Sequence, residues 1–324
     1  MSRLRGGALL AAAVLALAAG SCDLSATSSA DVPLVGLLRV IPDDDQPAFV
    51  EELRAQGWSR RDVEIVPDDP NAVAADAGAA RRQLREWLRA DVDLIVASST
   101  PYAVLAAEIA PDVPTLFLVN DPVAAGLVRD RSRPDGNMTG VTFRTPADRT
   151  IDLASQVLGG GLDRVGYLAP VGDPAVAGHR ARVRAAAQDL EVDLLEVDFD
   201  GREAVPAAVD ELRAAEVDVV YLASANATVQ AMDVLEAELE AAGLPVVANA
   251  DYLDFALLVL APDGEEVRRQ LARQAARLLA GADVSSVPVE DPRRFVTIVN
   301  REAAAALGLS PIDPAVLRKM DVVR

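Results

Sequence analysis

Short apolar runs alternate with longer helical segments along almost the whole chain, and this alternation limits the possible folds more than any other feature. The runs are rich in Val, Ile and Leu, which is typical of strands buried on both faces of a parallel sheet. The helical segments between them can supply the right-handed crossovers that parallel strands require. The sequence therefore predicts an α/β protein built on parallel sheets.

The pattern restarts after residue 143, and this divides the expected elements into two sets. The expected strands cover residues 34–41, 63–66, 94–97, 115–119, 139–143, 164–168, 193–197, 218–222 and 245–248. The expected helices cover residues 47–57, 71–90, 146–158, 175–190, 202–215, 227–242 and 263–279, with a further helix that starts at Pro101. Two successive sets of strands of similar size imply two similar lobes.

Two of the expected strands end in a polar residue followed by proline, in Ser99-Thr100-Pro101 and in Asn120-Asp121-Pro122. Ser, Thr and Asp can cap the following helix, and proline suits its first position. The first turn of such a helix has free backbone N–H groups and a partial positive charge, which favour an anion. Because both turns lie at the carboxyl edge of the sheet, they predict a binding crevice there.

The N-terminus has the features of a signal peptide. Arg3 and Arg5 precede an apolar run over residues 8–19, which is too short for a comfortable membrane span. Cys22, the only cysteine, follows this run, and Ala19-Gly20-Ser21-Cys22 resembles the lipobox of bacterial lipoproteins with Ala19 in place of the usual leucine. An ordinary secretory signal with an incidental cysteine is the alternative. We favour a lipidated Cys22, because a lone thiol in a secreted protein is a liability.

The rest of the composition excludes several classes of function. The net charge of −19 argues against nucleic acid as a partner. No Walker loop is present, no GxGxxG follows a strand, and one cysteine and one histidine cannot form a Cys/His zinc site. The histidine, His179, is expected on a helix surface rather than as a catalytic base. We therefore expect no catalytic residues, no metal and no cofactor.

Three motifs in a fixed order carry a resemblance to a known family. They are Leu94-Ile95-Val96-Ala97 with Thr100-Pro101, Asp121-Pro122-Val123 with Gly126-Leu127-Val128, and Gly136-Asn137-Met138-Thr139-Gly140-Val141. From about Leu34 to the C-terminus, the chain resembles substrate-binding proteins of bacterial ABC transporters, in the branch that includes tryptophan- and phenylalanine-type binding proteins.

The resemblance implies the type I periplasmic binding protein fold, in which a three-segment hinge joins two Rossmann-like lobes with parallel sheets. The expected organisation is a signal peptide (1–22), a tether (23–31), a first lobe (32–143 plus about 252–282) and a second lobe (144–251 plus about 283–324). The resemblance also implies a monomeric receptor that binds a small molecule, contacts a membrane permease and stays on the extracytoplasmic side of the membrane through its lipid anchor.

The residues expected to line the crevice follow strands of either lobe. They are Ser98, Ser99, Thr100, Tyr102, Asn120 and Asp121 in the first lobe, and Asp173, Ser224, Asn226, Asn249 and Asp251 in the second. Ser99, Thr100, Asp121 and Asp173 could instead be plain helix caps, and a cap contributes only about 1 kcal/mol. Tyr102 could equally be a packing residue, and Tyr252 is the second aromatic candidate.

Two differences from the family pattern and one acidic run bear on the ligand. Ser224-Ala225-Asn226-Ala227 stands where the family often has Thr-Asp-Asn-Thr, and Asn249-Ala250-Asp251 stands where it often has Gly-Asp-Glu. The loss of these acids weakens the case for a simple amino acid, although Asp251 can compensate. The run Asp43-Asp44-Asp45 could bind a cationic group or a metal ion, but a solvated loop is the favoured interpretation.

The function predicted from these features is that of a solute receptor for an ABC importer, with an amino acid or a similar small molecule as the ligand. A sensory module that passes ligand binding to a signalling partner is the alternative, since the same two lobes can serve it. An enzyme on this scaffold is disfavoured by the near absence of His, Cys and Lys.

Overall fold

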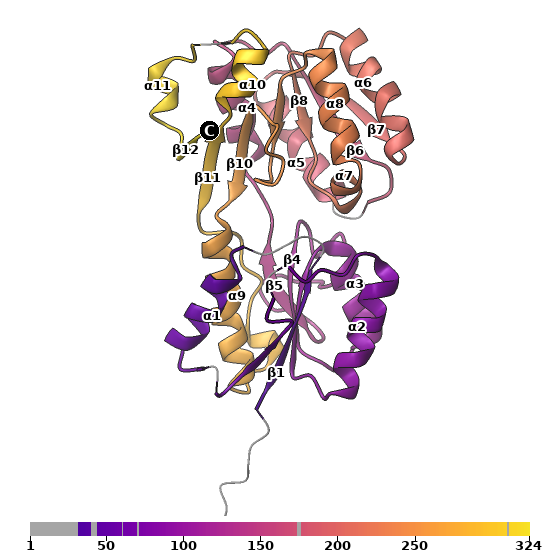
Figure 1. The fold of residues 1–324 in the computed structure, drawn as a ribbon, viewed down its shortest axis with the longest axis vertical. Coiled ribbons are helices and arrows are strands. Elements are labelled where there is room, and N and C mark those ends of the chain that lie inside the picture. Colours follow the sequence, from indigo (N-terminus) through magenta and orange to yellow (C-terminus); the bar gives the residue numbers. More distant parts are fainter. Residues whose placement is uncertain (1–31, 40–43, 60, 70, 174–175, 310) are drawn as a thin grey trace, which may run out of the picture. The chain divides into compact units, whose positions relative to one another are not determined.

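The computed structural model describes residues 32–39, 44–59, 61–69, 71–173, 176–309 and 311–324. Within Val32–Arg324, which form one compact unit, the strands make two sheets of mostly parallel strands (Figure 1), which confirms the predicted α/β fold. The expected signal peptide, the tether, Cys22 and Asp43 lie outside the described residues. No described helix is long and apolar enough to cross a membrane.

The first sheet has five parallel strands in the order β2-β1-β3-β4-β5. They are β1 (Leu34–Arg39), β2 (Glu64–Val66), β3 (Leu94–Ser98), β4 (Thr115–Val119) and β5 (Met138–Thr142). Helices α1 (Gln46–Ala55) and α9 (Gly264–Leu279) pack on one face, and α2 (Ala77–Arg89) and α3 (Thr100–Ile109) pack on the other. On β1, Val35 and Leu37 face α1 and α9, whereas Leu38 faces α2, as the two-residue period of a strand requires.

Gly36 of β1 allows α2 to lie close to the sheet. A Cβ at this position would lie 2.6 Å from the indole of Trp87, which is 4% exposed. Leu84 and Trp87, which the sequence places on one face of this helix, therefore pack directly over the strand.

The second sheet has seven strands in the order β12-β11-β10-β9-β8-β6-β7, and only the β10–β11 pair is antiparallel. The strands are β6 (Arg164–Pro170), β7 (Asp193–Phe199), β8 (Val219–Leu222), β9 (Val246–Ala248), β10 (Leu258–Pro262), β11 (Phe295–Val299) and β12 (Val322–Val323). Helices α4 (Ala147–Val157), α5 (Val176–Asp189), α10 (Arg301–Ala306) and α11 (Pro314–Leu317) cover one face, and α6 (Val205–Ala214) and α8 (Met232–Ala242) cover the other. We call each sheet with its helices a lobe.

The helix expected over residues 227–242 is two helices in the structure. Helix α7 (Asn226–Gln230) ends at Ala231, and α8 starts directly after it. Ala231 has φ −106° and ψ 7°, which lies outside the α-helical region, so the chain changes direction there. Helix α2 also begins later than expected, because the side chain of Asp76 accepts a hydrogen bond from the Ala79 N–H and caps the helix there.

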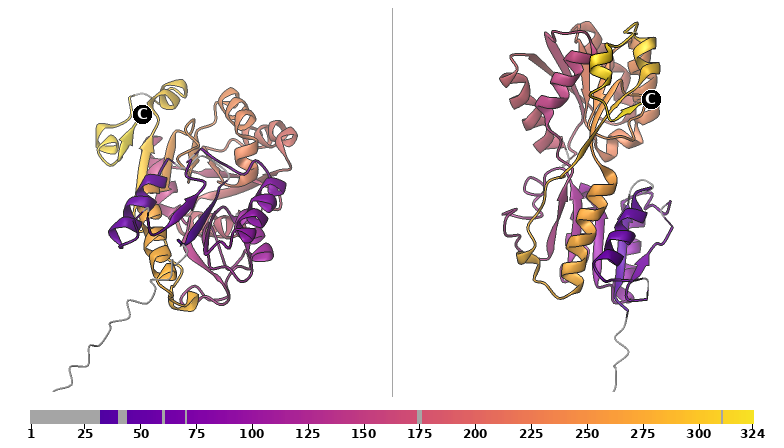
Figure 2. Two further views of the ribbon diagram at one scale, coloured as in Figure 1. Left: turned by 60° about the horizontal axis from the view of Figure 1, so that its bottom comes forward. Right: turned by 90° about the vertical axis from the view of Figure 1, so that its left-hand side faces the viewer.

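The chain passes between the two sheets three times, after β5, after β10 and before β11 (Figure 2). The segment that returns to the first lobe, expected at about residues 252–282 and called the returning segment below, starts later than expected. Residues 258–262 form the fully buried strand β10 of the second sheet instead. The returning segment also extends further, since Thr139 Oγ1 donates to the Val287 carbonyl (2.7 Å) and the Glu290 N–H donates to Gly140 (3.0 Å). Along the chain, α9 therefore lies between two strands of the second lobe, β10 and β11, but in space it packs with α1 in the first lobe.

His179 does not lie on the surface, so that expectation is wrong. It is 1% exposed, because it lies on the same side of α5 as Val183 and this side packs against the sheet. Its Nδ1 lies 3.0 Å from the Tyr167 hydroxyl, and its Nε2 lies 3.4 Å from the Tyr221 hydroxyl. Burial lowers the pKa of His179 to about 3, and the charge of Arg182 acts in the same direction.

Replacement of His179 with glutamine is expected to reduce the loss of stability in acid. The unfolded histidine binds a proton below its ordinary pKa of 6.5, whereas the buried one does so only near pH 3. The folded state is therefore fully stabilised above pH 6.5 and loses stability as the pH falls from there toward 3. At pH 5 this amounts to about 2 kcal/mol. Urea unfolding at several pH values measures it, and identical pH profiles for His179→Gln and the parent would contradict it.

Candidate ligand-binding site

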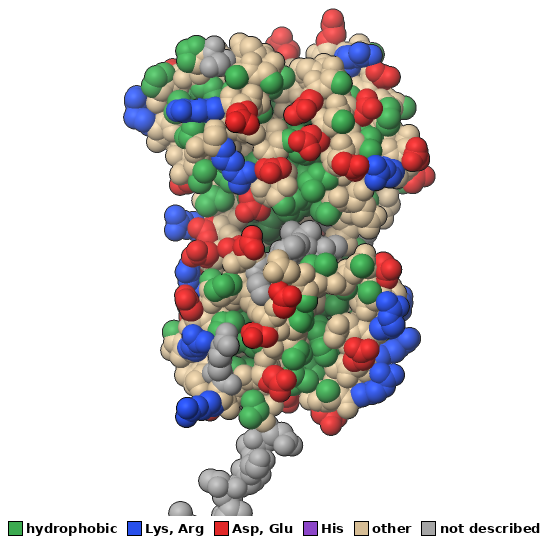
Figure 3. Space-filling view, viewed as in Figure 1, with side chains coloured by type: hydrophobic (Ala, Val, Ile, Leu, Met, Phe, Trp, Pro, Cys, Tyr) green, Lys and Arg blue, Asp and Glu red, His purple; other side chains and the backbone are tan. Residues whose placement is uncertain are grey.

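A cavity of about 430 Å³ lies between the two lobes, where strands of both sheets end. It is lined by residues that follow β1, β3 and β4 of the first lobe and β8 and β9 of the second, together with residues at the start of α9. In Figure 3 the hollow between the lobes has apolar side chains at its base and acidic side chains beside it. Such a volume is in the usual range for a small-molecule site.

Seven of the eleven residues predicted to bind ligand line this cavity. They are Ser98, Ser99, Thr100, Asn120, Ser224, Asn226 and Asp251. Each ends a parallel strand or lies within four residues after one, and the carboxyl ends of parallel strands meet at one edge of a sheet. The structure thus brings together residues from four separate loops.

The N-terminus of α3 forms one wall of the cavity. Ser99 has an extended backbone (φ −177°, ψ 157°), and its Oγ accepts a hydrogen bond from the Tyr102 N–H at 3.3 Å. Pro101 occupies the first turn, where it needs no N–H partner. The backbone N–H groups of this turn and the helix dipole favour a carboxylate or another anion at this wall.

Charged side chains of both signs also line the cavity. The acids are Asp44, Asp45 and Asp251, and the bases are Arg39, Arg268 and Arg324. The guanidinium of Arg39, which is 2% exposed, donates to Gln46 Oε1 and to the Asp69 carbonyl, so that it is fixed in the wall. Asp45 contacts α9, since a Cβ at Gly264 would lie 1.8 Å from its carboxylate.

Ser224 connects the two lobes inside the cavity. Its N–H donates to Asn249 Oδ1 (3.1 Å), its hydroxyl is hydrogen-bonded to the Tyr252 hydroxyl, and its carbonyl accepts from Asn120 Nδ2 of the first lobe (3.4 Å). Burial raises the pKa of Tyr252 to about 12, so its phenol stays protonated at neutral pH. The Ser224–Tyr252 pair therefore presents neutral donors and acceptors to the cavity.

The other four predicted residues do not line the cavity. Tyr102 is 3% exposed, and its hydroxyl donates to the Ala74 carbonyl (2.6 Å) within the packing of α2 and α3. Asn249 is fully buried behind Ser224, which it positions. Asp173 lies before α5, and its carbonyl accepts from the Val176 N–H. Asp121 follows Asn120 in the chain, but its side chain points toward α5 and not into the cavity.

Asp121-Pro122 begins a single turn, not the helix that its sequence suggested. Asp121 Oδ1 accepts hydrogen bonds from the N–H groups of Val123 (3.2 Å) and Ala124 (3.1 Å). The chain then leaves the helical path at Gly126, which has φ +72°. The side chain of Asp121 thus fixes a compact turn that faces α5.

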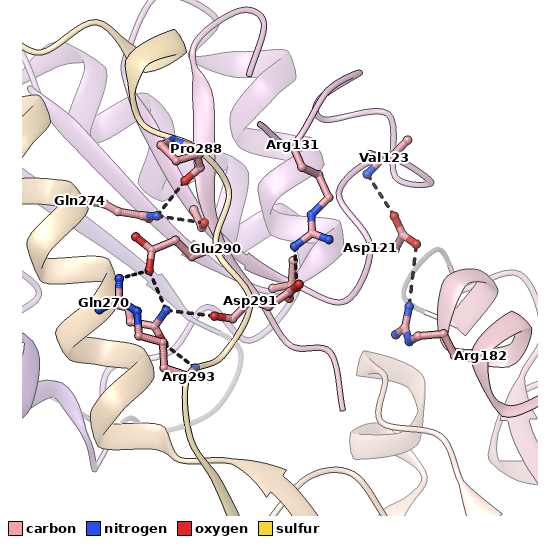
Figure 4. Close-up of polar contacts among 12 residues, drawn as sticks. Asp121, Val123, Arg131, Arg182, Gln270, Gln274, Pro288, Glu290, Asp291 and Arg293 are labelled. Atoms are coloured by element: carbon pink, nitrogen blue, oxygen red, sulfur yellow. Dashed lines mark hydrogen bonds and ion pairs between the residues drawn. The ribbon is translucent and has the colours of Figure 1, made fainter. Parts of the chain in front are cut away.

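The free side of the Asp121 carboxylate faces the second lobe. Its Oδ2 lies 4.0 Å from Arg182 Nη1, and a Cβ at Gly178 would lie 2.3 Å from the same oxygen (Figure 4). The buried nitrogens of the Arg182 guanidinium form no hydrogen bond with the described residues. Burial lowers the pKa of Arg182, and the positive charge of Arg144 acts in the same direction, whereas Asp121 opposes both. Asp121 is therefore the carboxylate that compensates this cation.

A second polar network fixes the returning segment near the crossing points (Figure 4). Asp291 accepts hydrogen bonds from Thr142 Oγ1 (2.6 Å) and from the guanidinium of Arg131. Burial would raise the pKa of Asp291, but the Thr142 hydrogen bond and Arg131 outweigh it and lower the pKa. Gln270 of α9 donates to Glu290 Oε2 (2.9 Å) and to the Asp291 carbonyl (3.0 Å). These contacts hold α9 and β5 together at the hinge.

Several lining residues were not predicted from the sequence. They are Arg39, Leu118, Val119, Phe143, Ala225, Val229, Pro262, Gly264, Val267, Arg268 and Arg324. Phe143 could have been found, because it ends an expected strand. Asp44 and Asp45, for which a solvated loop was favoured, line the cavity, as does Tyr252. Among the described residues, no group of three or more His, Cys, Asp or Glu side chains could hold a metal ion.

One family model matches most of the chain. The profile of the family described as ABC transporter substrate binding protein matches residues 48–322. A tyrosine-binding protein of Clostridioides difficile (strain R20291) is 23% identical over 273 residues, which are 83% of this chain and 78% of the relative.

Solved structures show the same fold. A conserved domain protein from Vibrio cholerae has a TM-score of 0.79 at 22% identity, covering 90% of this chain and 100% of its own. A Streptococcus pneumonia ABC domain in complex with L-Trp has a TM-score of 0.78 at 19% identity, covering 90% and 99%. A ligand-free, open substrate-binding protein with adhesive properties from Clostridium difficile has a TM-score of 0.68 at 22% identity, also covering 90% and 99%.

Replacement of Asp121 with asparagine is expected to destabilise the protein by about 2 kcal/mol, because it leaves the mostly buried cation of Arg182 uncompensated. Asp198→Asn is the matched control, since its partner Arg180 keeps a second carboxylate in Glu196. Urea unfolding of both variants measures the difference. An Asp121→Asn variant that loses no more stability than Asp198→Asn would contradict the role given to Asp121.

Proposed function

Because the chain belongs to the ABC transporter substrate-binding protein family, we propose that it is the lipid-anchored, extracytoplasmic solute receptor of an ABC importer. It captures a small ligand between its lobes and delivers it to the permease in the membrane. The observation that carries this proposal is the cavity lined from both lobes, with a helix N-terminus on one side and Asp251 on the other.

The ligand that best fits this cavity is an amino acid. The first turn of α3 receives its carboxylate, and Asp251 pairs with its ammonium group. Asp251 thereby takes over the role of the two acids that the family pattern has and this chain lacks. Phe143, Val229 and Val267 provide an apolar surface for the side chain. The tyrosine-binding relative and the L-Trp complex support an aromatic amino acid as the first choice.

Capture follows from contacts with both lobes. A ligand that touches α3 and Asp251 together stabilises the arrangement in which these groups are close, and so shifts the hinge equilibrium. The Asn120–Ser224 hydrogen bond spans the lobes beside the ligand and favours the same arrangement. The resulting surface, formed by both lobes, is what the permease recognises.

Titration calorimetry with the common amino acids tests the ligand class. An aromatic amino acid is expected to bind, and Asp251→Asn is expected to weaken it by at least tenfold, since a charge-assisted hydrogen bond contributes about 1.5–3 kcal/mol. The matched control is Asp254→Asn, which removes an exposed acid three residues further on that does not line the cavity. A des-amino analogue of the same ligand should bind both variants equally.

Two results would contradict this assignment. One is the failure of every amino acid to bind the parent protein. The other is an equal loss of affinity in Asp251→Asn and Asp254→Asn, which would mean that net charge, rather than a contact with Asp251, affects binding.

Replacement of Cys22 with serine is expected to release the protein from the membrane fraction. A lipidated cysteine would be the site of attachment, and serine has no thiol to modify. Fractionation of cells that express either form, with metabolic labelling by a fatty-acid analogue, measures both effects. Equal membrane association and no label on the parent protein would contradict the anchor.

A further inference from the structure

Four arginines lie along one side of α2. Arg81, Arg82, Arg85 and Arg89 fall within about 100° of the helix circumference, given 3.6 residues per turn. The opposite side, with Ala80, Leu84 and Trp87, is buried against the first sheet. We call the four arginines the α2 arginine face. In Figure 3, basic side chains follow one another down the edge of the first lobe where Figure 1 places α2.

Ion pairs are more frequent on the two other arginine-rich helices, α5 and α9, than on α2. On α9, Arg269 pairs with Glu265, and Arg273 pairs with Glu52 and Glu266. On α5, the ion pairs are Arg180 with Glu196 and Asp198, Arg182 with Asp121, and Arg184 with Glu196.

On α2, Arg81 pairs with Glu108 at 3.6 Å, whereas Arg82, Arg85 and Arg89 are exposed and form no ion pair with a described residue. The acids closest along the helix form no ion pair with these three arginines. Glu86 lies at the border of the arginine face, and the carboxylate of Asp76 is occupied by the helix cap.

This concentration of positive charge is unusual in a chain with a net charge of −19. Screening limits the reach of exposed charges to about 10 Å at ordinary ionic strength, so a nearby anion responds to α2 rather than to the distant acids. Guanidinium groups also bind phosphate oxygens well. The chemistry of the face therefore fits a surface that presents many phosphates.

The course of the chain places such a surface within reach. The described chain enters the first sheet beside the end of α2, where the Leu34 N–H donates to Asp93 Oδ2 (2.8 Å) and the Asp93 N–H donates to the Leu34 carbonyl (2.9 Å). The nine residues Asp23–Asp31 separate Cys22 from Val32 and can span at most about 30 Å. Arg81 and Arg89 are about 12 Å apart along the helix axis.

We propose that the α2 arginine face binds the headgroups of anionic phospholipids and holds the first lobe against the membrane. The proposal rests on the lipid anchor of the proposed function, which keeps the face close to the bilayer. The anchor keeps the protein at the bilayer, and contacts of the basic face with the headgroups add an orientation to that attachment. The second lobe, which carries no contact of this kind, then stays free to move about the hinge.

The single cysteine allows a direct test. Residues 22–324 are coupled through Cys22 to a maleimide phospholipid, on vesicles of phosphatidylcholine alone or of phosphatidylcholine with phosphatidylglycerol. Both tryptophans, Trp58 and Trp87, pack in the first lobe, so energy transfer from them to dansyl headgroups reports the approach of that lobe. Transfer is expected to be higher on the anionic vesicles and to fall as salt is added.

The variant Arg82→Gln/Arg85→Gln/Arg89→Gln is expected to show the same low transfer on both kinds of vesicle. Each arginine near an anionic surface raises the equilibrium constant for contact with that surface by about fivefold. The three together raise it on the order of 100-fold. The control Arg213→Gln/Arg301→Gln/Arg318→Gln removes the same charge from exposed positions of the second lobe and should behave like the parent.

Equal transfer from the parent on both kinds of vesicle would overturn the proposal, as would an equal loss in the control variant. Chemical coupling supplies the anchor, so the result does not depend on lipidation in the cell. Ligand titration of the same proteins separates this test from the proposed function: a protein that binds no amino acid but approaches anionic vesicles would contradict only the latter.

Discussion

The cavity depends on the common direction of the strands in each sheet. Parallel strands joined by helical crossovers end at the same edge, so that residues 98–100 and 120 meet in one lobe and residues 224–226 and 249–251 meet in the other. The antiparallel β10–β11 pair brings one further element, the start of α9, to the same edge. Strand β10 carries the chain to this edge and into α9, and β11 brings it back, so that the start of α9 becomes part of the cavity wall.

Pairing of charges keeps this acidic chain compact at the places where its lobes meet. Arg182 would be a buried, uncompensated cation without Asp121, and Asp291 is held by Arg131 and Thr142 next to a crossing segment. Asn120 and Asp121 are neighbours, yet one contacts Ser224 in the cavity and the other contacts α5 outside it. A movement of one lobe against the other must therefore change both contacts at once.

Much of the site could be predicted, because local patterns determine it. An apolar run followed by Ser-Thr-Pro identifies both the strand end and the helix cap, and this placed Ser98–Thr100 correctly at the edge of the sheet. Contacts between distant segments could not be predicted in this way. The hydroxyl of Tyr102 donates to the Ala74 carbonyl. Arg268 lies on α9, which follows the unpredicted strand β10, and Arg324 follows the unpredicted strand β12. His179 is buried by tyrosines of β6 and β8.

A crystal structure of residues 32–324 with the amino acid that binds most tightly tests the central claim most directly. The account predicts that the ligand lies between the lobes, with its carboxylate hydrogen-bonded to backbone N–H groups in the first turn of α3 and its ammonium group within hydrogen-bond distance of Asp251. A ligand that contacts one lobe only, or that lies with its ammonium group toward α3, would contradict the account.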